Sequence, residues 1–298
     1  MKARIVEVGP RDGLQNEKAT IPTETKVAFV DALSEAGYDE IEVSAFVSPK
    51  WVPQLADAEA VFERIRRREG VIYSALVPNE QGLDRAFGAR VGKIAVFTAA
   101  SETFNRKNVN AGIAESIERF APVVPRAQAA GLSVRGYVST AFWCPYEGKI
   151  APQAVVDVVK RLLDVGADEI SIGDTIGKAV PGEVHDLLDL LLDALAQDRI
   201  AMHFHDTYGT AVANALTAYD RGISVFDASA GGVGGCPFAP GAAGNVATED
   251  LFWALTRSGA SIALDLERVS AASSLLASAL RRSLRSRVRD ALSEGKDL

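Results

Sequence analysis

The sequence predicts an α/β protein that folds as a (β/α)8 TIM barrel with a C-terminal helical extension. Three observations predict this fold: short β-branched runs recur along the chain, a helix-length amphipathic segment follows each of them, and eight such units succeed one another without a linker. Strict alternation of strands and helices implies parallel strands. Eight units over about 250 residues match a closed barrel better than an open sheet with a second domain. We therefore expect a single domain over residues 1–298, with the barrel over about 1–258 and the terminal helices over about 265–292.

The candidate strands share a high content of β-branched and other apolar residues and a length typical of strands. They are residues 4–8, 40–44, 71–76, 93–97, 133–139, 168–172, 200–204 and 224–229. Between them, apolar residues recur at helical spacing, which predicts helices. These segments are residues 23–37, 113–131, 153–166, 183–197 and 210–222. Several of them end at glycine, a residue typical of helix C-termini.

The tail after Asp250 is also predicted to be helical. Apolar residues recur there every fourth position, at Leu276, Leu280, Leu284 and Val288. Such a stripe packs on another surface, either the barrel or a second subunit, and the second case would give a homodimer. A cluster of arginines lies on the same predicted helix, at Arg281, Arg282, Arg285, Arg287 and Arg289. A solvated face or a subunit contact is the usual role of such a cluster, and a site for an anionic ligand is the alternative.

Composition narrows the classes of protein. The 298 residues include 32 Lys and Arg against 39 Asp and Glu, for a net charge of −7, which argues against a nucleic-acid partner. Only two cysteines are present, Cys144 and Cys236, so a disulfide-stapled secreted scaffold is excluded. The longest uncharged stretch, 228–248, contains several glycines and two prolines that would break a membrane helix. With no secretion signal at the start, we expect a cytoplasmic protein without membrane partners.

Reactive residues gather where the predicted strands end, and in a (β/α)8 barrel functional sites lie at those C-terminal ends. Arg11 and Asp12 follow the first strand in a tight Gly-Pro turn. Glu42 lies on the second strand, with Ile41 and Val43 pointing the other way because side chains alternate along a strand. Asp174 follows the sixth strand. These side chains are therefore expected to face one site.

Two of the three histidines lie at positions i and i+2 of the seventh strand, as His203 and His205. This spacing places both imidazoles on one face of the strand, here the barrel interior. With Asp12 and an amide oxygen such as that of Asn245, they form a set of two nitrogens and two hard oxygens. Such a set favours Mg²⁺ or Mn²⁺ over structural zinc. The third histidine, His185, is expected on the surface of a helix.

A glycine-rich loop follows the eighth strand and contains Cys236. Glycines permit close approach of the backbone to a ligand and movement of the loop, so we expect a functional thiol there. For Cys144, which follows the fifth strand, packing and function are both open. The loop has neither a P-loop Lys-Ser/Thr pair nor a Rossmann spacing, and the chain has no Gly-x-Ser-x-Gly nucleophile elbow.

At these residues the sequence resembles the 3-hydroxy-3-methylglutaryl-CoA lyase family, within the superfamily of metal-dependent barrel lyases and synthases. The resemblance covers nearly the whole chain. It rests on the segments VEVGPRDGLQNE at 6–17, FVSPKWVPQ at 46–54, CPYEG at 144–148, HFHDTYG at 203–209, and GGCP at 234–237 with the residues through Asn245 to Glu249 and Asp250. The cysteine-containing glycine-rich loop is the segment that distinguishes the lyases from the related synthases.

The resemblance implies cleavage of 3-hydroxy-3-methylglutaryl-CoA to acetyl-CoA and acetoacetate, as in leucine degradation or ketone-body chemistry. The metal ligands that it implies are Asp12, His203, His205 and Asn245. It assigns to Arg11 the stabilisation of the thioester oxyanion. Cys236 becomes the acid/base, assisted by Asp12 and His203. Glu42 and Asp174 would orient groups and buffer charge, and Asn108, beside Arg106 and Lys107, would contact coenzyme A.

Two positions depart from the pattern of the family. Ala45 stands where a serine is often found, and Trp143 replaces a small residue before Cys144. Three other functions therefore stay open. The first is a lyase for a related 3-hydroxy-3-alkylglutaryl-CoA or branched acyl-CoA, because a pocket separates one methylene by only about 1–3 kcal/mol. The others are a synthase that condenses acetyl-CoA with a 2-oxo acid, and an inactive barrel that serves as a scaffold.

Overall fold

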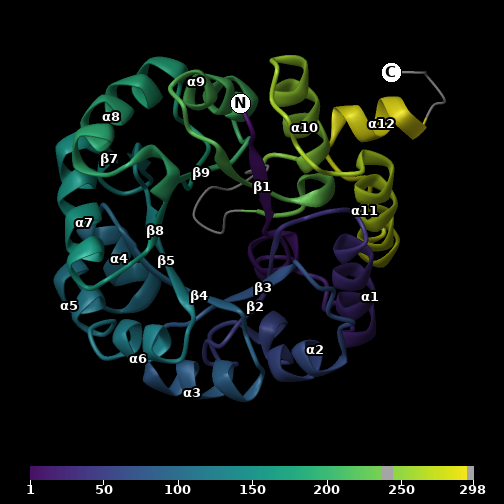
Figure 1. Ribbon diagram of the computed structural model, residues 1–298, viewed down its shortest axis with the longest axis horizontal. Helices are drawn as coiled ribbons and strands as arrows, with labels where there is room; N and C mark the ends of the chain where they lie inside the picture. The colour runs from purple at the N-terminus through teal and green to yellow at the C-terminus, as the bar shows by residue number, and fades with distance from the viewer. Residues whose placement is uncertain (236–243, 294–298) are drawn as a thin grey trace.

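The structure is a computed structural model that describes residues 1–235 and 244–293, and its strands form a closed parallel barrel (Figure 1). The barrel strands are β1 (Arg4–Glu7), β2 (Glu40–Ala45), β3 (Ile72–Leu76), β4 (Lys93–Ala99), β5 (Ser133–Ser139), β8 (Glu169–Asp174), β9 (Ile200–Phe204) and β10 (Val225–Ala228). Each corresponds to one predicted strand, with ends that differ by no more than two residues. The predicted fold class is therefore confirmed.

The barrel closes between its first and last strands. β1 pairs with β10, with Arg4 opposite Val225, and pairs on its other side with β2, with Glu7 opposite Ile41. A short antiparallel hairpin lies outside the barrel, formed by β6 (Trp143–Cys144) and β7 (Gly148–Lys149). The sequence analysis did not predict this hairpin, because two-residue strands carry no detectable periodicity.

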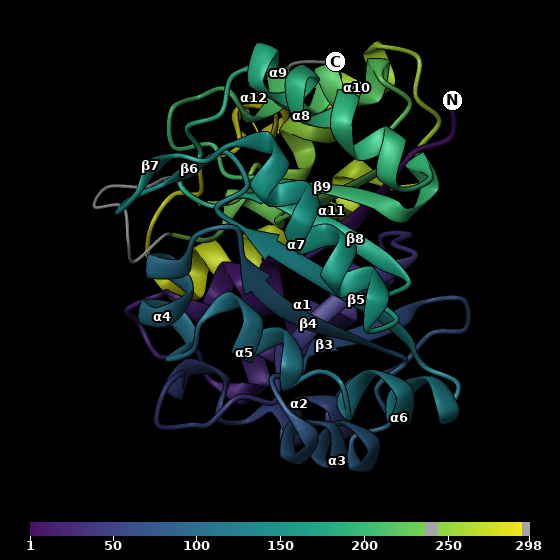
Figure 2. The same cartoon turned by 90° about the vertical axis from the view of Figure 1, so that its left-hand side faces the viewer.

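Helices surround the barrel, as Figures 1 and 2 show from two directions. They are α1 (Thr23–Ser34), α2 (Ala58–Arg64), α3 (Glu80–Gly88), α4 (Glu102–Val109), α5 (Ile113–Glu118), α6 (Val123–Ala129), α7 (Pro152–Asp164), α8 (Pro181–Ala194), α9 (Ala211–Asp220), α10 (Thr248–Arg257), α11 (Leu266–Leu280) and α12 (Arg287–Ser293). After α7 the chain turns at Gly166 with a φ of 101°, a left-handed conformation that favours glycine.

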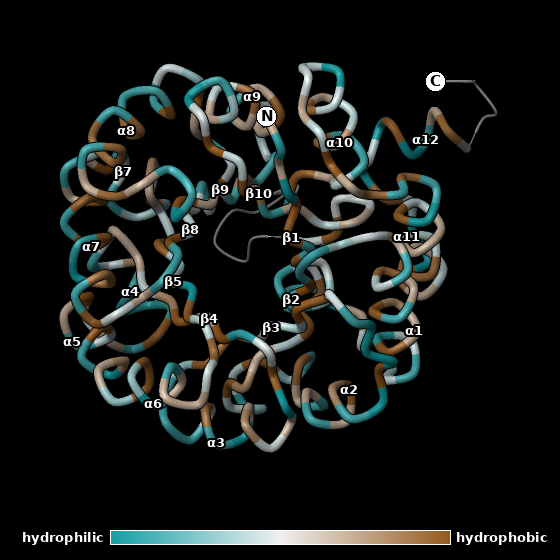
Figure 3. The backbone as a smooth tube through the Cα atoms, in the orientation of Figure 1, coloured by the Kyte–Doolittle hydropathy of each residue, from teal (hydrophilic) through white to brown (hydrophobic). Residues whose placement is uncertain are grey.

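The main apolar core lies between the strands and the surrounding helices. Ile170 and Leu188 are fully buried there, and along the helices hydrophobic and hydrophilic residues alternate in Figure 3. The inward faces of the strands are more polar. Arg135 on β5 and Asp227 on β10 are almost completely buried inside the barrel. Because side chains alternate along a strand, these polar residues share the inner face with His203 of β9.

The helical segment predicted over 113–131 is two helices, α5 and α6. Pro122 lies immediately before α6 and Pro125 lies within its first turn. A proline has no amide hydrogen to donate to the preceding turn, so it is tolerated at the start of a helix and not in its interior. The two prolines therefore explain the break.

The prediction that the leucine stripe and the arginine cluster share one helix is wrong, whereas the terminal helices expected over about 265–292 are present as α11 and α12. α11 ends at Leu280, and Arg281 adopts the left-handed conformation with a φ of 51°. The chain re-enters a helix only at Arg287, so the five arginines do not share one helix. Leu276 and Leu284 are nevertheless buried, and α11 packs beside α1.

The arginine cluster is dispersed by this break. Arg282 forms an ion pair with Glu17, and Arg287 approaches Asp206 at 3.9 Å. Leu284 is only 4% exposed, and a side chain at Gly231 would collide with it. The segment between α11 and α12 therefore packs on the glycine-rich stretch that follows β10.

Among the residues that the structure describes, no helix has both the length and the apolar character that crossing a membrane requires.

Candidate functional site

A carboxylate and two imidazoles meet at the C-terminal end of the barrel. Asp12 lies in the helical turn Gly9–Gly13 after β1, whereas His203 and His205 lie at the end of β9 and just beyond it. The Nε2 atoms of His203 and His205 are 3.9 and 3.7 Å from Asp12 Oδ2. Ligand atoms of all three residues lie within 4.8 Å of one another. The histidine spacing therefore brings both rings to one site, as the sequence predicts.

Asn245 lies beside these three residues. It forms an isolated bridge with His205, and its Nδ2 donates to Asp12 Oδ2 at 3.0 Å and to the carbonyl oxygen of Val233 at 3.3 Å. In this orientation the amide nitrogen faces the carboxylate, so a half-turn of the amide would bring its oxygen there. Two imidazole nitrogens, a carboxylate and an amide oxygen fit a divalent cation that accepts both nitrogen and hard oxygen ligands.

The protonation of the centre follows from burial and neighbouring charges. Burial alone would raise the pKa of Asp12, but Arg11 and the two histidines hold it well below its usual range. Burial opposes protonation of both histidines, yet Asp227 and Asp12 raise the pKa of His203 above its ordinary value. The pKa of His205 is lowered, with burial as the main cause. The carboxylate is therefore ionised at neutral pH, as a metal ligand requires.

Arg11 is held rigidly beside Asp12. Its Nε donates to Glu42 Oε2 and its Nη1 to Asp12 Oδ1, both at 2.7 Å, and the side chain is 7% exposed. The guanidinium also lies over the ring of Tyr137, 5.4 Å from its centroid. Glu42 is buried, which raises its pKa despite the charge of Arg11. The predicted pairing of a cation with strand-end carboxylates is thus present in the structure.

The side chains of the other predicted residues make separate contacts, although the carbonyl oxygen of Asp174 accepts from the amide of His205 at 3.4 Å. Asp174 ends β8 and accepts hydrogen bonds from the amides of Lys178 and Ala179 at 3.1 and 2.9 Å. Burial raises its pKa to about 6. Asn108 lies on the exposed face of α4, and Lys107 beside it stacks on Tyr146 at 4.7 Å. Neither Asp174 nor Asn108 contacts Asp12 among the interactions of the described residues.

The structure describes only one of the two cysteines. Cys236 lies outside the described residues. Cys144 is buried, with its Sγ 3.1 Å from Ser101 Oγ, and it lines a cavity of about 330 Å³ together with Trp143 and Tyr208. A packed thiol with a hydroxyl partner favours the structural interpretation of Cys144.

The two positions that depart from the family pattern occupy different surroundings. Ala45 is fully buried inside the barrel, in a small cluster with Leu76 and Tyr137. Trp143 donates through Nε1 to the carboxylate of Glu183 at 3.1 and 3.2 Å, and Lys178 lies 3.8 Å from the centroid of its ring. The predicted surface position of His185 is confirmed, since half of its side chain is exposed.

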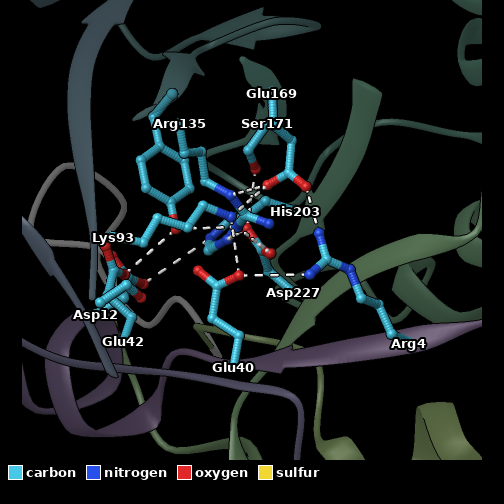
Figure 4. A network of polar contacts seen from close by, with 12 residues as sticks. Arg4, Asp12, Glu40, Glu42, Lys93, Arg135, Glu169, Ser171, His203 and Asp227 are labelled. Carbon is cyan, nitrogen blue, oxygen red and sulfur yellow. Dashed lines mark hydrogen bonds and ion pairs between the residues drawn. The ribbon is translucent and has the colours of Figure 1, made fainter. Parts of the chain in front are cut away.

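The buried polar residues that the sequence analysis missed include Tyr137, Arg135 and Asp227, and Figure 4 labels the last two. Tyr137 donates to Glu42 Oε2 at 3.3 Å, and its ring meets that of His203 edge-on. Asp227 lies 3.2 Å from His203 Nδ1, and Arg135 donates to Asp227 at 2.6 Å. The period-two spacing of residues 135 and 137, and of 225 and 227, is the signal that could have identified them.

Comparison with known proteins gives one consistent result. The HMGL-like family model matches residues 2–276. The chain is 49% identical to the mitochondrial hydroxymethylglutaryl-CoA lyase of Bos taurus over 97% of this chain and 89% of that protein. It is also 49% identical to the cytoplasmic 3-hydroxy-3-methylglutaryl-CoA lyase of Rattus norvegicus, over 97% and 84%.

A solved structure agrees with these relatives. An HMG-CoA lyase from Acinetobacter baumannii, in complex with coenzyme A and 3-methylmalate, superposes with a TM-score of 0.93. The two sequences are 38% identical, over 97% of this chain and 95% of that one. With a closed barrel, a strand-end cluster of carboxylate and imidazoles, and these similarities together, the chain belongs to the HMGL-like family.

Proposed function

We propose that this protein is a divalent-cation-dependent carbon–carbon lyase that cleaves (S)-3-hydroxy-3-methylglutaryl-CoA to acetyl-CoA and acetoacetate. The observation that carries the proposal is the convergence of Asp12, His203 and His205 beside the buried Arg11, in a chain of the HMGL-like family. The reaction is a retro-Claisen step. The bond between C2 and C3 of the acyl group breaks as the tertiary hydroxyl loses its proton and becomes the ketone of acetoacetate.

Asp12, His203, His205 and Asn245 would hold Mg²⁺ or Mn²⁺. Bound there, the cation would act as a Lewis acid toward the substrate hydroxyl and lower its pKa. The chain's own contribution is a carboxylate that stays ionised next to Arg11 and two imidazoles fixed on one strand face. Because the donor set comes from the turn after β1, the end of β9 and the stretch after β10, an intact barrel is needed to assemble it.

Arg11 is the group that we assign to the developing negative charge on the thioester oxygen. A fixed cation near the point where charge accumulates needs little reorganisation during the reaction. Glu42 supports this role, because its contact with Arg11 Nε fixes the plane of the guanidinium. The Nη1 contact with Asp12 links the same guanidinium to the cation-binding group.

Two proton transfers complete the reaction. We assign removal of the hydroxyl proton to the carboxylate of Asp12 and protonation of the acetyl-CoA carbanion to Cys236, with His203 assisting as a ligand of the cation. Asp174, whose pKa is about 6, would buffer charge at the rim of the site. We also propose Asn108 as a contact for coenzyme A.

A second candidate substrate is a 3-hydroxy-3-alkylglutaryl-CoA with a larger alkyl group. Ala45 favours it, because this fully buried position inside the barrel carries a side chain smaller than the serine of the family pattern. Rates measured for the methyl, ethyl and propyl substrates with wild type and Ala45→Ser distinguish the two. A relative gain for the longer chains in wild type would support the alternative.

The first experiment combines substrate, cation and thiol. Purified protein is incubated with 3-hydroxy-3-methylglutaryl-CoA, Mg²⁺ and a thiol reductant, and acetoacetate is measured with and without EDTA beside Cys236→Ser. We expect release that EDTA abolishes, that Mn²⁺ or Mg²⁺ restores, and that falls at least about 100-fold in the variant. Cys144→Ser is the matched control and should keep most of the activity. Absence of acetoacetate from folded, cation-loaded protein would reject this substrate.

The compartment and the assembly are proposals as well. We propose a cytoplasmic location, in keeping with the small number of cysteines, while the relatives bear both mitochondrial and cytoplasmic names.

We also propose a homodimer that uses α11, where Leu275 is 39% exposed. Light scattering after size exclusion tests it, and Leu275→Glu should shift the mass toward that of the monomer.

A further inference from the structure

The two ring nitrogens of His203 face different partners. Nε2 points toward Asp12, at 3.9 Å from its Oδ2. On the opposite side of the ring, Nδ1 lies 3.2 Å from Oδ2 of Asp227, a β10 residue that is 2% exposed (Figure 4). A neutral imidazole carries one hydrogen, and an ionised carboxylate only accepts. The contact with Asp227 therefore places the hydrogen on Nδ1 and leaves the lone pair of Nε2 free.

Asp227 is itself fixed from two other strands. Its Oδ1 accepts from Arg135 Nη1 of β5 at 2.6 Å, and its Oδ2 accepts from Ser171 Oγ of β8 at 2.9 Å. Arg135 is 1% exposed and also donates through Nε to Glu169. The carboxylate thus has no freedom to turn away from His203, and the network that holds it lies inside the barrel, below the candidate cation site.

We propose that Asp227 is a positioning residue that holds His203 as the Nδ1–H tautomer with Nε2 aimed at the cation site, and thereby sets the affinity for the divalent cation. The inference rests on the proposed function, in which His203 is a ligand. Groups that orient a metal-binding histidine in this way typically contribute a factor of about 10–100 in metal affinity. Arg135 acts through Asp227, and Glu169 contacts Arg135, Lys93 and Arg4 but not His203.

Cation binding tests the proposal without any acyl-CoA. Free Mn²⁺ is measured by electron paramagnetic resonance during titration of wild type, Asp227→Asn and Glu169→Gln, with circular dichroism to verify folding. We expect the dissociation constant of Asp227→Asn to rise about 10–100-fold. Glu169→Gln is the matched control, because it removes a buried carboxylate with the same Arg135 partner but no contact with His203. It should bind Mn²⁺ within about twofold of wild type.

Wild-type affinity in folded Asp227→Asn would overturn the proposal. An equal weakening in both variants would also overturn it, since loss of any buried charge would then explain the result. Because Mn²⁺ binding is measured without substrate, a protein that binds Mn²⁺ as expected but releases no acetoacetate would reject the proposed reaction and leave the role of Asp227 intact.

A second measurement does not depend on whether Asp227→Asn folds. The chain has three histidines, so two-bond ¹H–¹⁵N spectra of metal-free wild type at slightly alkaline pH resolve each ring. His203→Gln identifies the signals of His203 by their loss. The Nδ1–H tautomer supports the proposal, and the Nε2–H tautomer contradicts it.

Discussion

At the scale of single residues, the position of Arg11 between two carboxylates determines what the site can stabilise. The guanidinium donates a hydrogen bond through Nε to Glu42 and another through Nη1 to Asp12. Among the contacts of the described residues, Nη2 makes no hydrogen bond, so it remains as a donor for an incoming ligand in a direction fixed by the plane of the group. A lysine carries the same charge but a single nitrogen without this planar arrangement, so it cannot reproduce the geometry.

We therefore predict that Arg11→Lys lowers kcat for cleavage of the methylglutaryl substrate at least about 100-fold. The KM and the affinity for Mn²⁺ should change much less, because the charge near Asp12 is kept. Steady-state kinetics and Mn²⁺ titration measure the two effects. Arg64→Lys, which alters an exposed arginine paired with Glu24, is the control and should behave like wild type. A kcat above one tenth of the wild-type value in Arg11→Lys would refute the assigned role.

The sequence predicts part of this site and misses the rest for a physical reason. His203 and His205 were identified because two imidazoles at i and i+2 must share a strand face. Asp227 and Arg135 were missed because charged residues inside strands normally indicate solvent exposure. Here the two charges neutralise each other inside the barrel, and that pairing joins strands that are far apart in the sequence.

At the scale of elements, strands were predicted closely and helix ends less well. The β-branched runs are set by local pattern, so their bounds agree within two residues. The left-handed turn at Arg281 contains no glycine or proline from which the sequence could predict it. It follows instead from the burial of Leu284 against Gly231, a contact between segments far apart in the sequence. Tertiary packing therefore overrides the leucine stripe in the tail.

The ionisation of Glu249, in the first turn of α10, makes the free energy of unfolding depend on pH. Both of its oxygens accept from the amide of Gly231, at 3.0 and 2.8 Å, and burial raises its pKa from 4.5 to about 7. The folded state holds this proton more tightly than the unfolded state does. The stabilisation is therefore complete below about pH 4.5 and is lost as the pH rises through about 7.

Glu249→Gln, which cannot ionise, should remove this dependence. Between pH 5 and 8 we expect wild type to lose about 2–3 kcal/mol more of its free energy of unfolding than the variant loses. Urea unfolding at the two pH values measures the difference. Glu267→Gln, at an exposed position of α11, is the control and should follow wild type. Parallel curves for wild type and Glu249→Gln would contradict the prediction.

At the scale of the whole molecule, the barrel is filled by charges as well as by apolar side chains. Lys93 contacts both Glu40 and Glu169 at 2.8 and 3.0 Å, and Arg135 links Glu169 to Asp227 (Figure 4). These pairs connect strands on different sides of the barrel. Removing one partner leaves buried charge without compensation, which costs more than the intact pair contributes.

We predict that Arg135→Met lowers the free energy of unfolding by about 3–5 kcal/mol, because Asp227 and Glu169 lose a shared cation. The loss should be nearly the same at about 0.05 and 1 M NaCl, since salt screens buried charges weakly. Urea unfolding at both salt concentrations measures it. Arg64→Met, at an exposed pair, should cost less than about 1 kcal/mol. A cost for Arg135→Met that disappears in high salt would show that the interior is open to solvent.

The closure of the barrel between β1 and β10 also determines when the site comes into existence during synthesis. Arg4 lies opposite Val225, and the amino group of Met1 donates to Tyr219 Oη at 3.0 Å. At about 5–20 residues per second, a ribosome needs roughly 10–40 s after it has made Asp12 to reach the last strand. During that interval the first strand has no β10 to pair with, and Asp12 has neither histidine beside it. On the proposed function, a nascent chain would acquire the cation only at the end of its synthesis, so that metal uptake would mark the completion of the barrel.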